Sequence, residues 1–175
     1  MTIVLIAAQS LDGFITRHDT PGAGFTSTED KAWFARALQG FDVSILGGAT
    51  YRAERPMFLV NRKPGRRRVV LTRQPEAYAE DAVPGVLEFT AEPPSVLVKR
   101  LAEAGHARCA LLGGGQIHRL FLEAGLVDQL WITMEPRLFG SGTPLVGGHV
   151  DIALTWLGSE SLGGNTQLLR YAIRK

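Results

Sequence analysis

The sequence predicts a three-layer α/β/α protein with a mixed, mainly parallel sheet and a C-terminal antiparallel hairpin. Short apolar runs alternate along the chain with segments of helical periodicity, as in parallel sheets whose strands are joined by helices. The first run, residues 3–8, is continuously apolar, which is typical of a strand buried on both faces. Near the C-terminus, two strand-like segments flank a glycine-rich turn, which favours a hairpin.

The remaining elements follow from the same signals. Strands are predicted at residues 42–47, 69–72, 86–89, 110–112 and 127–135, and the hairpin pairs residues 152–158 with 167–173. A first helix follows the capping-box spacing of Thr26 and Glu29 and stops at Gly40. A second helix runs from Pro94 to Gly105, and a third ends at Gly125. We therefore expect ligands at the carboxyl ends of the strands, where open α/β sheets bind them.

Composition indicates one globular domain over residues 1–175. The chain is 45% hydrophobic and 21% charged, and no stretch of about 20 apolar residues could span a bilayer. The N-terminus runs directly into the first predicted strand without a basic leader, so we expect a cytoplasmic protein without membrane contact.

Cysteine and histidine usage gives no sign of a metal site. The single cysteine, Cys109, lies in an apolar run and is expected to be an inert core thiol. The histidines lack metal-ligand spacing; they are His18, His106, His118 and His149. We expect no bound metal.

Charge is distributed unevenly, although the net charge is only +2. A basic run without acids contains Arg62, Lys63, Arg66, Arg67, Arg68 and Arg73, and an acidic segment follows it. The run is either a solvated loop or a phosphate site, since guanidinium groups bind phosphate in a bidentate fork. Because no nucleic-acid module is visible, we favour a small phosphorylated ligand over nucleic acid.

Two glycine-rich turns stand where predicted strands lead into helices. Gly47 and Gly48 form one, and residues 113–115 form the other. Such turns let a backbone approach a phosphate and let a helix offer its free N–H groups, although either turn alone could be merely tight. Two in one domain favour a dinucleotide. The third glycine of the Rossmann fingerprint is replaced by His118.

Five segments in order resemble the dihydrofolate reductase superfamily. They are Ala-Gln-Ser-Leu-Asp-Gly-Phe-Ile at residues 8–15, Leu-Gly-Gly-Ala-Thr-Tyr at 46–51, Val-Val-Leu-Thr-Arg at 69–73, Leu-Gly-Gly-Gly at 112–115 and Leu-Val-Asp-Gln-Leu at 126–130. Within it, the chain is most similar to the reductase domain of bifunctional riboflavin-biosynthesis proteins and their stand-alone relatives. The match runs from residue 3 to about residue 171, which implies a dihydrofolate reductase-like fold.

The resemblance implies NADPH as the hydride donor. The positions that it assigns to the cofactor are Ala8, Ile15, Gly47, Gly48, Thr50, Thr72, Arg73, Gly113, Gly114, Gly115, Gln116 and Ile117. Thr72 and Arg73 would lie near the adenosine 2'-phosphate, where residues 66–68 could assist. Many dihydrofolate reductases carry an arginine that grips this phosphate where Gly48 stands, so this chain departs from the pattern.

Three acids are candidate catalytic residues. Asp12, after the first strand, matches an aspartate that lies beside nicotinamide and substrate in the riboflavin reductases. Asp30 stands on the first helix where dihydrofolate reductases carry the pterin-binding acid, and Glu135 closes the strand at residues 127–135. The structural alternatives are a turn residue for Asp12, a first-turn acid favoured by the helix dipole for Asp30, and a strand terminus for Glu135.

The resemblance implies reduction of a small pyrimidine-like substrate, in which an aminouracil ribosyl group becomes ribityl. Reduction of dihydrofolate or another pterin is the alternative, and a nucleotide-binding module without turnover is a third. Arg52, Arg55 and Arg62 could hold a substrate phosphate or be surface charge. The apolar segment Leu130, Trp131 and Ile132 hints at a homodimer surface.

Overall fold

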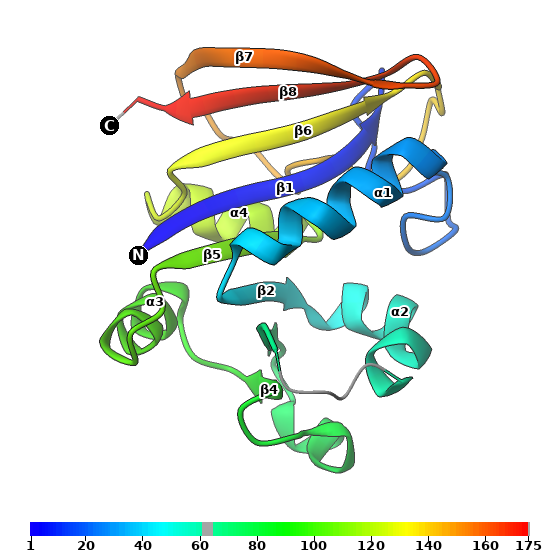
Figure 1. The fold of residues 1–175 in the computed structure, drawn as a ribbon. Helices are drawn as coiled ribbons and strands as arrows, with labels where there is room; N and C mark the ends of the chain where they lie inside the picture. Colours follow the sequence, from blue (N-terminus) through cyan, green and yellow to red (C-terminus); the bar gives the residue numbers. More distant parts are fainter. Residues whose placement is uncertain (61–64, 175) are drawn as a thin grey trace.

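A computed structural model describes residues 1–60 and 65–174 (Figure 1). Its strands are β1 (Thr2–Ser10), β2 (Val43–Gly47), β3 (Arg67–Leu71), β4 (Leu87–Thr90), β5 (Arg108–Gly113), β6 (Gln129–Glu135), β7 (Leu154–Gly163) and β8 (Thr166–Ile173). Its α-helices are α1 (Thr28–Ala37), α2 (Gly48–Val60), α3 (Pro94–Glu103) and α4 (Gly115–Glu123). Two 3-10 helices complete the described elements, η1 (Leu38–Gly40) and η2 (Pro75–Asp81).

The strands form one mixed sheet in the order β4-β3-β2-β5-β1-β6-β8-β7. The six strands from β4 to β6 are parallel, and β8 pairs antiparallel with both β6 and β7. Gly163, Gly164 and Asn165 turn the hairpin with positive φ, the conformation that glycine and asparagine adopt most easily. The predicted mainly parallel sheet with a terminal antiparallel hairpin is confirmed.

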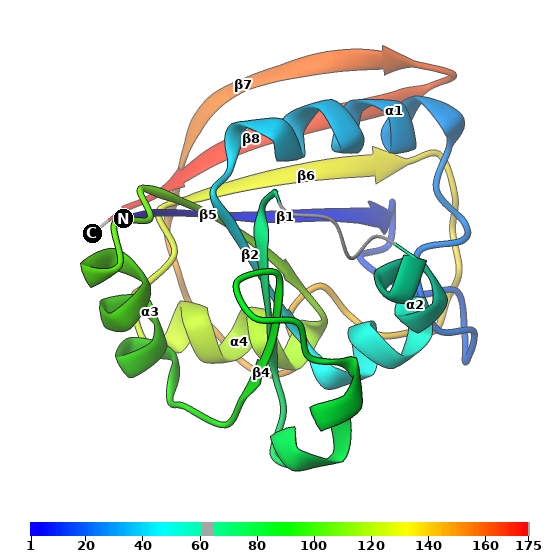
Figure 2. The same ribbon diagram turned by 60° about the horizontal axis from the view of Figure 1, so that its bottom comes forward.

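Helices cover both faces of the sheet, as predicted (Figures 1 and 2). On the face of α3 and α4, Ile3, Leu5 and Ile45 pack with Leu101 and Phe121. On the opposite face, a first cluster gathers under α1 and a second under α2, and Leu112 packs against both. Residues 3–6 of β1 are buried because they contribute to both layers in turn.

The predicted first helix and the predicted strands largely agree with the structure. Ser27, one residue after the expected Thr26, caps α1, and its hydroxyl accepts the backbone N–H of Asp30. Cys109 is buried in the core, as expected. The sequence indicated a helix after Gly48 without its end, and it did not predict η2. Pro56 lies inside α2, where proline is normally unfavourable.

The segment around Trp131 packs largely within its own chain. Leu130 and Ile132 are buried in the core. The ring of half-buried Trp131 packs against those of Trp33 and Phe41, with ring centroids 6.4 and 5.7 Å apart. β6 lies between β1 and β8 inside the sheet, so only its faces could meet a second copy. A homodimer surface at this segment stays a prediction.

The basic run does not form a phosphate site at the carboxyl ends of the strands. Arg66 donates to the carbonyl oxygen of Leu38 at 3.0 Å, and Arg67 pairs with Glu88. Both lie at the amino end of β3, whereas Thr72 and Arg73 follow its carboxyl end. The strand therefore separates residues that are neighbours in sequence, and one acid of the following segment, Glu88, neutralises Arg67. Arg62 and Lys63 lie outside the described residues.

None of the helices in the described ranges, 1–60 and 65–174, combines the length and the apolar character that a bilayer-spanning helix needs.

An ion pair between exposed Arg55 and buried Asp81 attaches α2 to η2. Tyr51 is fully buried and donates its hydroxyl to Asp81 Oδ2 at 2.8 Å, while Arg55 Nε and Nη2 each donate to the same carboxylate at 2.8 Å. Burial and the adjacent carboxylate raise the pKa of Tyr51 to about 12, so the phenol keeps the proton that it donates.

We expect Tyr51→Phe to lower the free energy of unfolding by about 1–3 kcal/mol, because the buried Asp81 carboxylate loses one of its donors. Urea unfolding followed by circular dichroism measures the change. Tyr171→Phe is the control, since no hydrogen bond to the Tyr171 hydroxyl is found in the described part of the chain. Equal stability of the two variants would contradict this role of Tyr51.

Candidate active site

Two helices begin side by side at the carboxyl edge of the sheet (Figure 2). β2 ends at Gly47 and its neighbour β5 ends at Gly113, and α2 and α4 start within two residues of these ends. Each helix start presents backbone N–H groups and the positive end of its dipole to the same space. This pair of helix starts suits a ligand with two adjacent phosphates.

The residues predicted to bind a cofactor converge there. A Cβ built on Gly114 would lie 3.7 Å from Thr50 Oγ1 and 3.8 Å from Ile15 Cδ1, which brings α4, α2 and the loop after β1 together. A Cβ built on Gly48 would likewise lie 3.4 Å from Thr72 Oγ1. Ile117 covers Gly47, whose Cβ would lie 2.7 Å from Ile117 Cγ1.

The other predicted cofactor positions are more scattered. Gln116 belongs to the first turn of α4, Arg73 is exposed just after β3, and Ala8 lies half-buried on β1 opposite Thr133 of β6. Gly115 faces away from Thr50, because its Cβ would lie 2.5 Å from the carbonyl oxygen of Pro144. Gly114 is thus the glycine of this turn that borders the shared space.

A buried histidine explains why position 113 must be glycine. His118 is fully buried on α4, and its Nε2 faces the Cα of Gly113, where any Cβ would clash with the ring. Its Nδ1 lies 2.7 Å from the carbonyl oxygen of Leu145, so Nδ1 carries the proton and donates it. Nε2 has no hydrogen-bond partner within the described residues. Burial lowers the pKa of His118 to about 4.

The loop that follows β6 connects these elements. Leu145 N–H donates to the carbonyl oxygen of Gly13 at 3.0 Å, and Gly147 N–H donates to that of Gly115 at 2.9 Å. Ile15 N–H in turn donates to the carbonyl oxygen of Thr143 at 2.8 Å. The loop at residues 136–147 therefore positions both the start of α4 and the loop after β1.

Asp12 ties this loop down from the other side. Its carboxylate accepts the Ser10 hydroxyl at 2.6 Å and the backbone N–H groups of Phe139 and Gly140 at 3.0 and 2.6 Å. These hydrogen bonds, with the Ser10 hydroxyl as the largest contribution, lower the pKa of Asp12. Asp12 is therefore an ionised group near neutral pH that holds two loops together.

Asp30 and Glu135 form a second, buried group of acids. They are 6% and 2% exposed, and Glu135 Oε1 accepts the backbone N–H and hydroxyl of Ser27, each at 3.0 Å. Burial, and secondarily the charge of Glu135, raises the pKa of Asp30. The fully buried Thr133 hydroxyl lies beside this carboxyl without a partner in hydrogen-bond geometry among the described residues.

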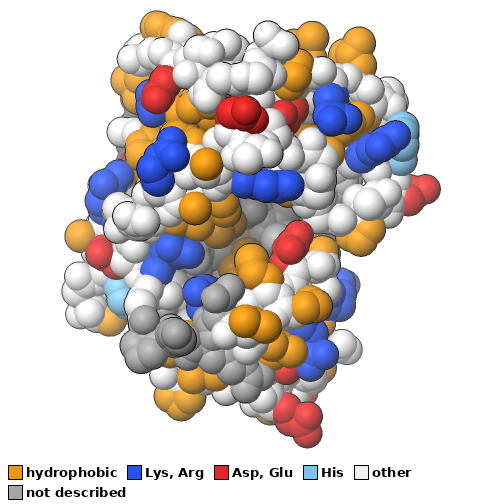
Figure 3. Space-filling view, turned by 45° about the vertical axis from the view of Figure 1, so that its right-hand side comes forward, with side chains coloured by type: hydrophobic (Ala, Val, Ile, Leu, Met, Phe, Trp, Pro, Cys, Tyr) orange, Lys and Arg blue, Asp and Glu red, His pale blue; other side chains and the backbone are white. Residues whose placement is uncertain are grey.

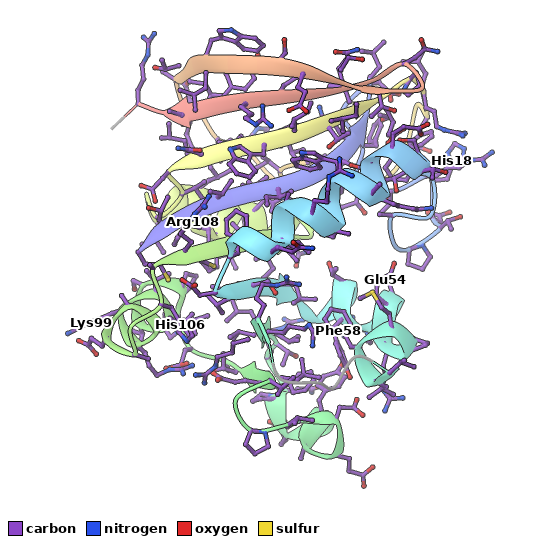
Figure 4. The ribbon with its side chains drawn as sticks, viewed as in Figure 1. His18, Glu54, Phe58, Lys99, His106 and Arg108 are labelled. Carbon is purple, nitrogen blue, oxygen red and sulfur yellow. The ribbon has the colours of Figure 1, made fainter. Side chains whose placement is uncertain are left out.

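The surface is hollowed between the level of α1 and that of α2 (Figure 3). α2 carries Glu54 and Phe58 (Figure 4), and the loop after β1 reaches this helix because Gly22 lies against the Glu54 carboxylate. Two cavities lie elsewhere, one lined by Arg55 and residues 76–81 and one by residues 122–123 and 149–152. Neither contains a predicted catalytic or cofactor-binding residue, and Arg55, a candidate for a substrate phosphate, pairs with Asp81 instead.

No metal site is found within residues 1–60 and 65–174, where no group of three or more histidine, cysteine or acidic side chains could hold an ion. His18 and His106 lie at opposite ends of the molecule (Figure 4).

Several residues of the site escaped sequence reasoning. Ser10, Thr133 and Thr166 surround the acids. The hydroxyl residues carried no motif, because their partners lie far along the chain. The alternation of β6 could have placed Thr133 on the face of α1, two residues before Glu135.

The family model described as RibD C-terminal domain matches residues 1–168 of the chain. The uncharacterized protein YwjB of Bacillus subtilis (strain 168) is 27% identical over 144 residues, which cover 81% of this chain and 80% of YwjB.

Two solved structures share the fold at low identity. RibD of Acinetobacter baumannii superposes with a TM-score of 0.81 at 17% identity, and the match covers 99% of this chain and 58% of that one. A dihydrofolate reductase of Enterococcus faecalis, complexed with NADP(H) and RAB-propyl, superposes with a TM-score of 0.69 at 17% identity and covers 99% of this chain and 97% of that one. The dihydrofolate reductase-like fold is thereby confirmed.

We expect His118 to make the protein less stable as the pH falls from about 6.5 to 4. In this range the unfolded chain protonates the imidazole, whereas the folded chain, with a pKa of about 4, keeps it neutral. This difference changes the free energy of unfolding by up to about 1.4 kcal/mol per pH unit. His118→Asn, whose amide can still donate to Leu145, is expected to lose that pH dependence in urea unfolding curves recorded across the range.

The matched control is His149→Asn, because His149 is exposed in the loop before β7. His149→Asn is expected to retain the wild-type dependence of the free energy of unfolding on pH. Parallel curves for the wild type and His118→Asn would show that His118 does not titrate as described.

Proposed function

Because the chain belongs to the RibD C-terminal domain family, we propose that it is an NADPH-dependent reductase of the riboflavin-biosynthesis type. Its substrate is a small pyrimidine, such as an aminouracil whose ribosyl group becomes ribityl. The observation that carries the proposal is the convergence of two glycine-rich helix starts, α2 and α4, at one edge of the sheet. The similarity in fold to a dihydrofolate reductase complexed with NADP(H) supports the same cofactor class.

The residues present fit a dinucleotide. Gly47, Gly48 and Thr50 would hold one part of the pyrophosphate, and residues 113–116 would hold the other with backbone N–H groups. Gly114 leaves open the space that a Cβ would fill beside Thr50 and Ile15. Ala8 and Ile15, on the β1 side, would contact the nicotinamide end. When bound, NADPH supplies the hydride.

Reduction of a ribosyl to a ribityl group also consumes one proton. Asp30 is suited to hold it, because burial and the nearby charge of Glu135 raise the pKa of its carboxyl. Glu135, held by Ser27, favours the protonated form of Asp30 by repulsion between like charges. Asp12 is suited to a different role, because its ionised carboxylate fixes the loops beside the cofactor.

Reduction of a pterin is the second candidate function. Asp30 beside the unpartnered Thr133 hydroxyl offers a carboxyl and a hydroxyl in one buried place, which would suit the ring edge of a pterin as well as that of a pyrimidine. The position of Asp30 on α1 is the specific observation that favours this alternative.

We expect the purified protein to bind NADPH in titration calorimetry and to oxidise it when an aminouracil ribosyl phosphate is added. Absence of binding at millimolar NADPH would refute the reductase. Oxidation with dihydrofolate alone, inhibited by methotrexate, would assign the pterin reaction instead. Binding of NADPH without oxidation by either substrate class would indicate a nucleotide-binding module without turnover.

Two acid variants separate the roles of the carboxylates. If protonated Asp30 supplies the proton, wild-type kcat falls as the pH rises through its raised pKa, and Asp30→Asn is slow at every pH without that fall. Asp12→Asn should lower turnover more than NADPH affinity while keeping the pH dependence, because it disturbs loop geometry. Stopped-flow pH profiles and calorimetry measure both, and an unchanged profile in Asp30→Asn would remove Asp30 from proton transfer.

A further inference from the structure

We propose that Arg52 makes this chain prefer a dinucleotide with a 2'-phosphate, acting from one helical turn beyond the position where Gly48 lacks a side chain. The inference rests on the proposed function, because it requires a dinucleotide at the start of α2. It concerns specificity between NADPH and NADH, which the family membership alone does not determine.

The guanidinium of Arg52 borders the space above Gly48. A Cβ on Gly48 would lie 3.4 Å from Arg52 Nη1 and 3.4 Å from both Cβ and Oγ1 of Thr72. Arg52 reaches this space because residues four apart lie on the same side of a helix. A cation from α2 and a hydroxyl from the end of β3 therefore face one small region.

Tyr78 holds the guanidinium in this position. Arg52 Nη1 donates to the Tyr78 hydroxyl at 3.0 Å, and the Tyr78 ring stacks on Phe89 with centroids 5.0 Å apart and planes at 11°. This is the one hydrogen bond of Arg52 within the described residues, so four of its five N–H groups can take an anion. The side chain is exposed to solvent, which lets a ligand reach it.

Other arginines nearby are committed to protein partners. Arg55 makes a bidentate pair with Asp81, and Arg66 and Arg67 are engaged at the amino end of β3. Arg73 is exposed immediately after Thr72 and is the second cation at this strand end. Arg52 thus shares the space above Gly48 with the Thr72 hydroxyl, and Arg73 follows Thr72 in sequence.

This arrangement fits a phosphate monoester. A guanidinium binds two phosphate oxygens in a fork, and a threonine hydroxyl can donate to a third. NADH offers a neutral hydroxyl at the corresponding carbon, which gains little from two cations. The expected result is discrimination by charge, with little effect on the rest of the dinucleotide.

Titration calorimetry tests the inference without turnover. We expect Arg52→Gln to bind NADPH about tenfold to a hundredfold more weakly and NADH within about twofold of wild type, the loss typical of one charge-assisted contact. The variant should lose affinity for adenosine 2',5'-bisphosphate as it does for NADPH. Its affinity for adenosine 5'-monophosphate should stay near that of the wild type, as for NADH. Arg174→Gln is the matched control, because Arg174 follows β8, which is four strands away from β2 in the sheet.

Two further variants test position and charge. Tyr78→Phe keeps the ring but removes the hydroxyl that holds Arg52, so it should weaken NADPH binding severalfold and leave NADH unchanged. Gly48→Arg combined with Arg52→Gln returns a cation to the same space and should restore the NADPH preference. Gly48 permits this change because its φ is not in the left-handed region.

Separate outcomes overturn the inference and the proposed function. If the wild type binds neither dinucleotide, the proposed function fails, and this inference fails with it. If the wild type binds both but Arg52→Gln keeps the wild-type ratio of affinities, the inference alone is overturned. Equal affinity of the wild type for NADPH and NADH would also overturn it.

Discussion

The contact between His118 and the Cα of Gly113 is the constraint on which the carboxyl edge depends. With no room for a Cβ there, the end of β5 comes close to the first turn of α4. The same imidazole donates to the carbonyl oxygen of Leu145, so one buried ring joins the sheet, the helix and the loop after β6. The imidazole is tolerated in the core because it is uncharged there, since burial lowers the pKa of His118 to about 4.

The loop after β6 transmits this order to the rest of the site. Backbone hydrogen bonds connect it to Gly13 and Ile15 on one side and to Gly115 on the other. Asp12 adds a charged contact at Phe139 and Gly140. The loop after β1 and the start of α4 are thus held by one loop, which gives the glycine-rich backbone near it a defined position.

The carboxyl groups of Asp12 and Asp30 have opposite electrostatic surroundings. Asp12 is exposed and accepts hydrogen bonds from a hydroxyl and two amides, which favours its charged form. Asp30 is removed from water and lies near Glu135, which favours its neutral form. The separation of their pKa values follows from burial and partners rather than from residue type, and it supports a division between loop positioning and proton transfer.

The sequence by itself determined the elements whose signals are local. Apolar runs located the strands, glycines at 40, 105 and 125 marked helix ends, and the paired glycine turns marked the starts of α2 and α4. Tertiary structure decided the rest. Strand direction carried Arg66 and Arg67 away from Thr72, β6 was placed inside the sheet, and Tyr78 was brought to Arg52. These outcomes depend on which distant segments meet, and pairing between distant segments leaves no periodic mark in the sequence.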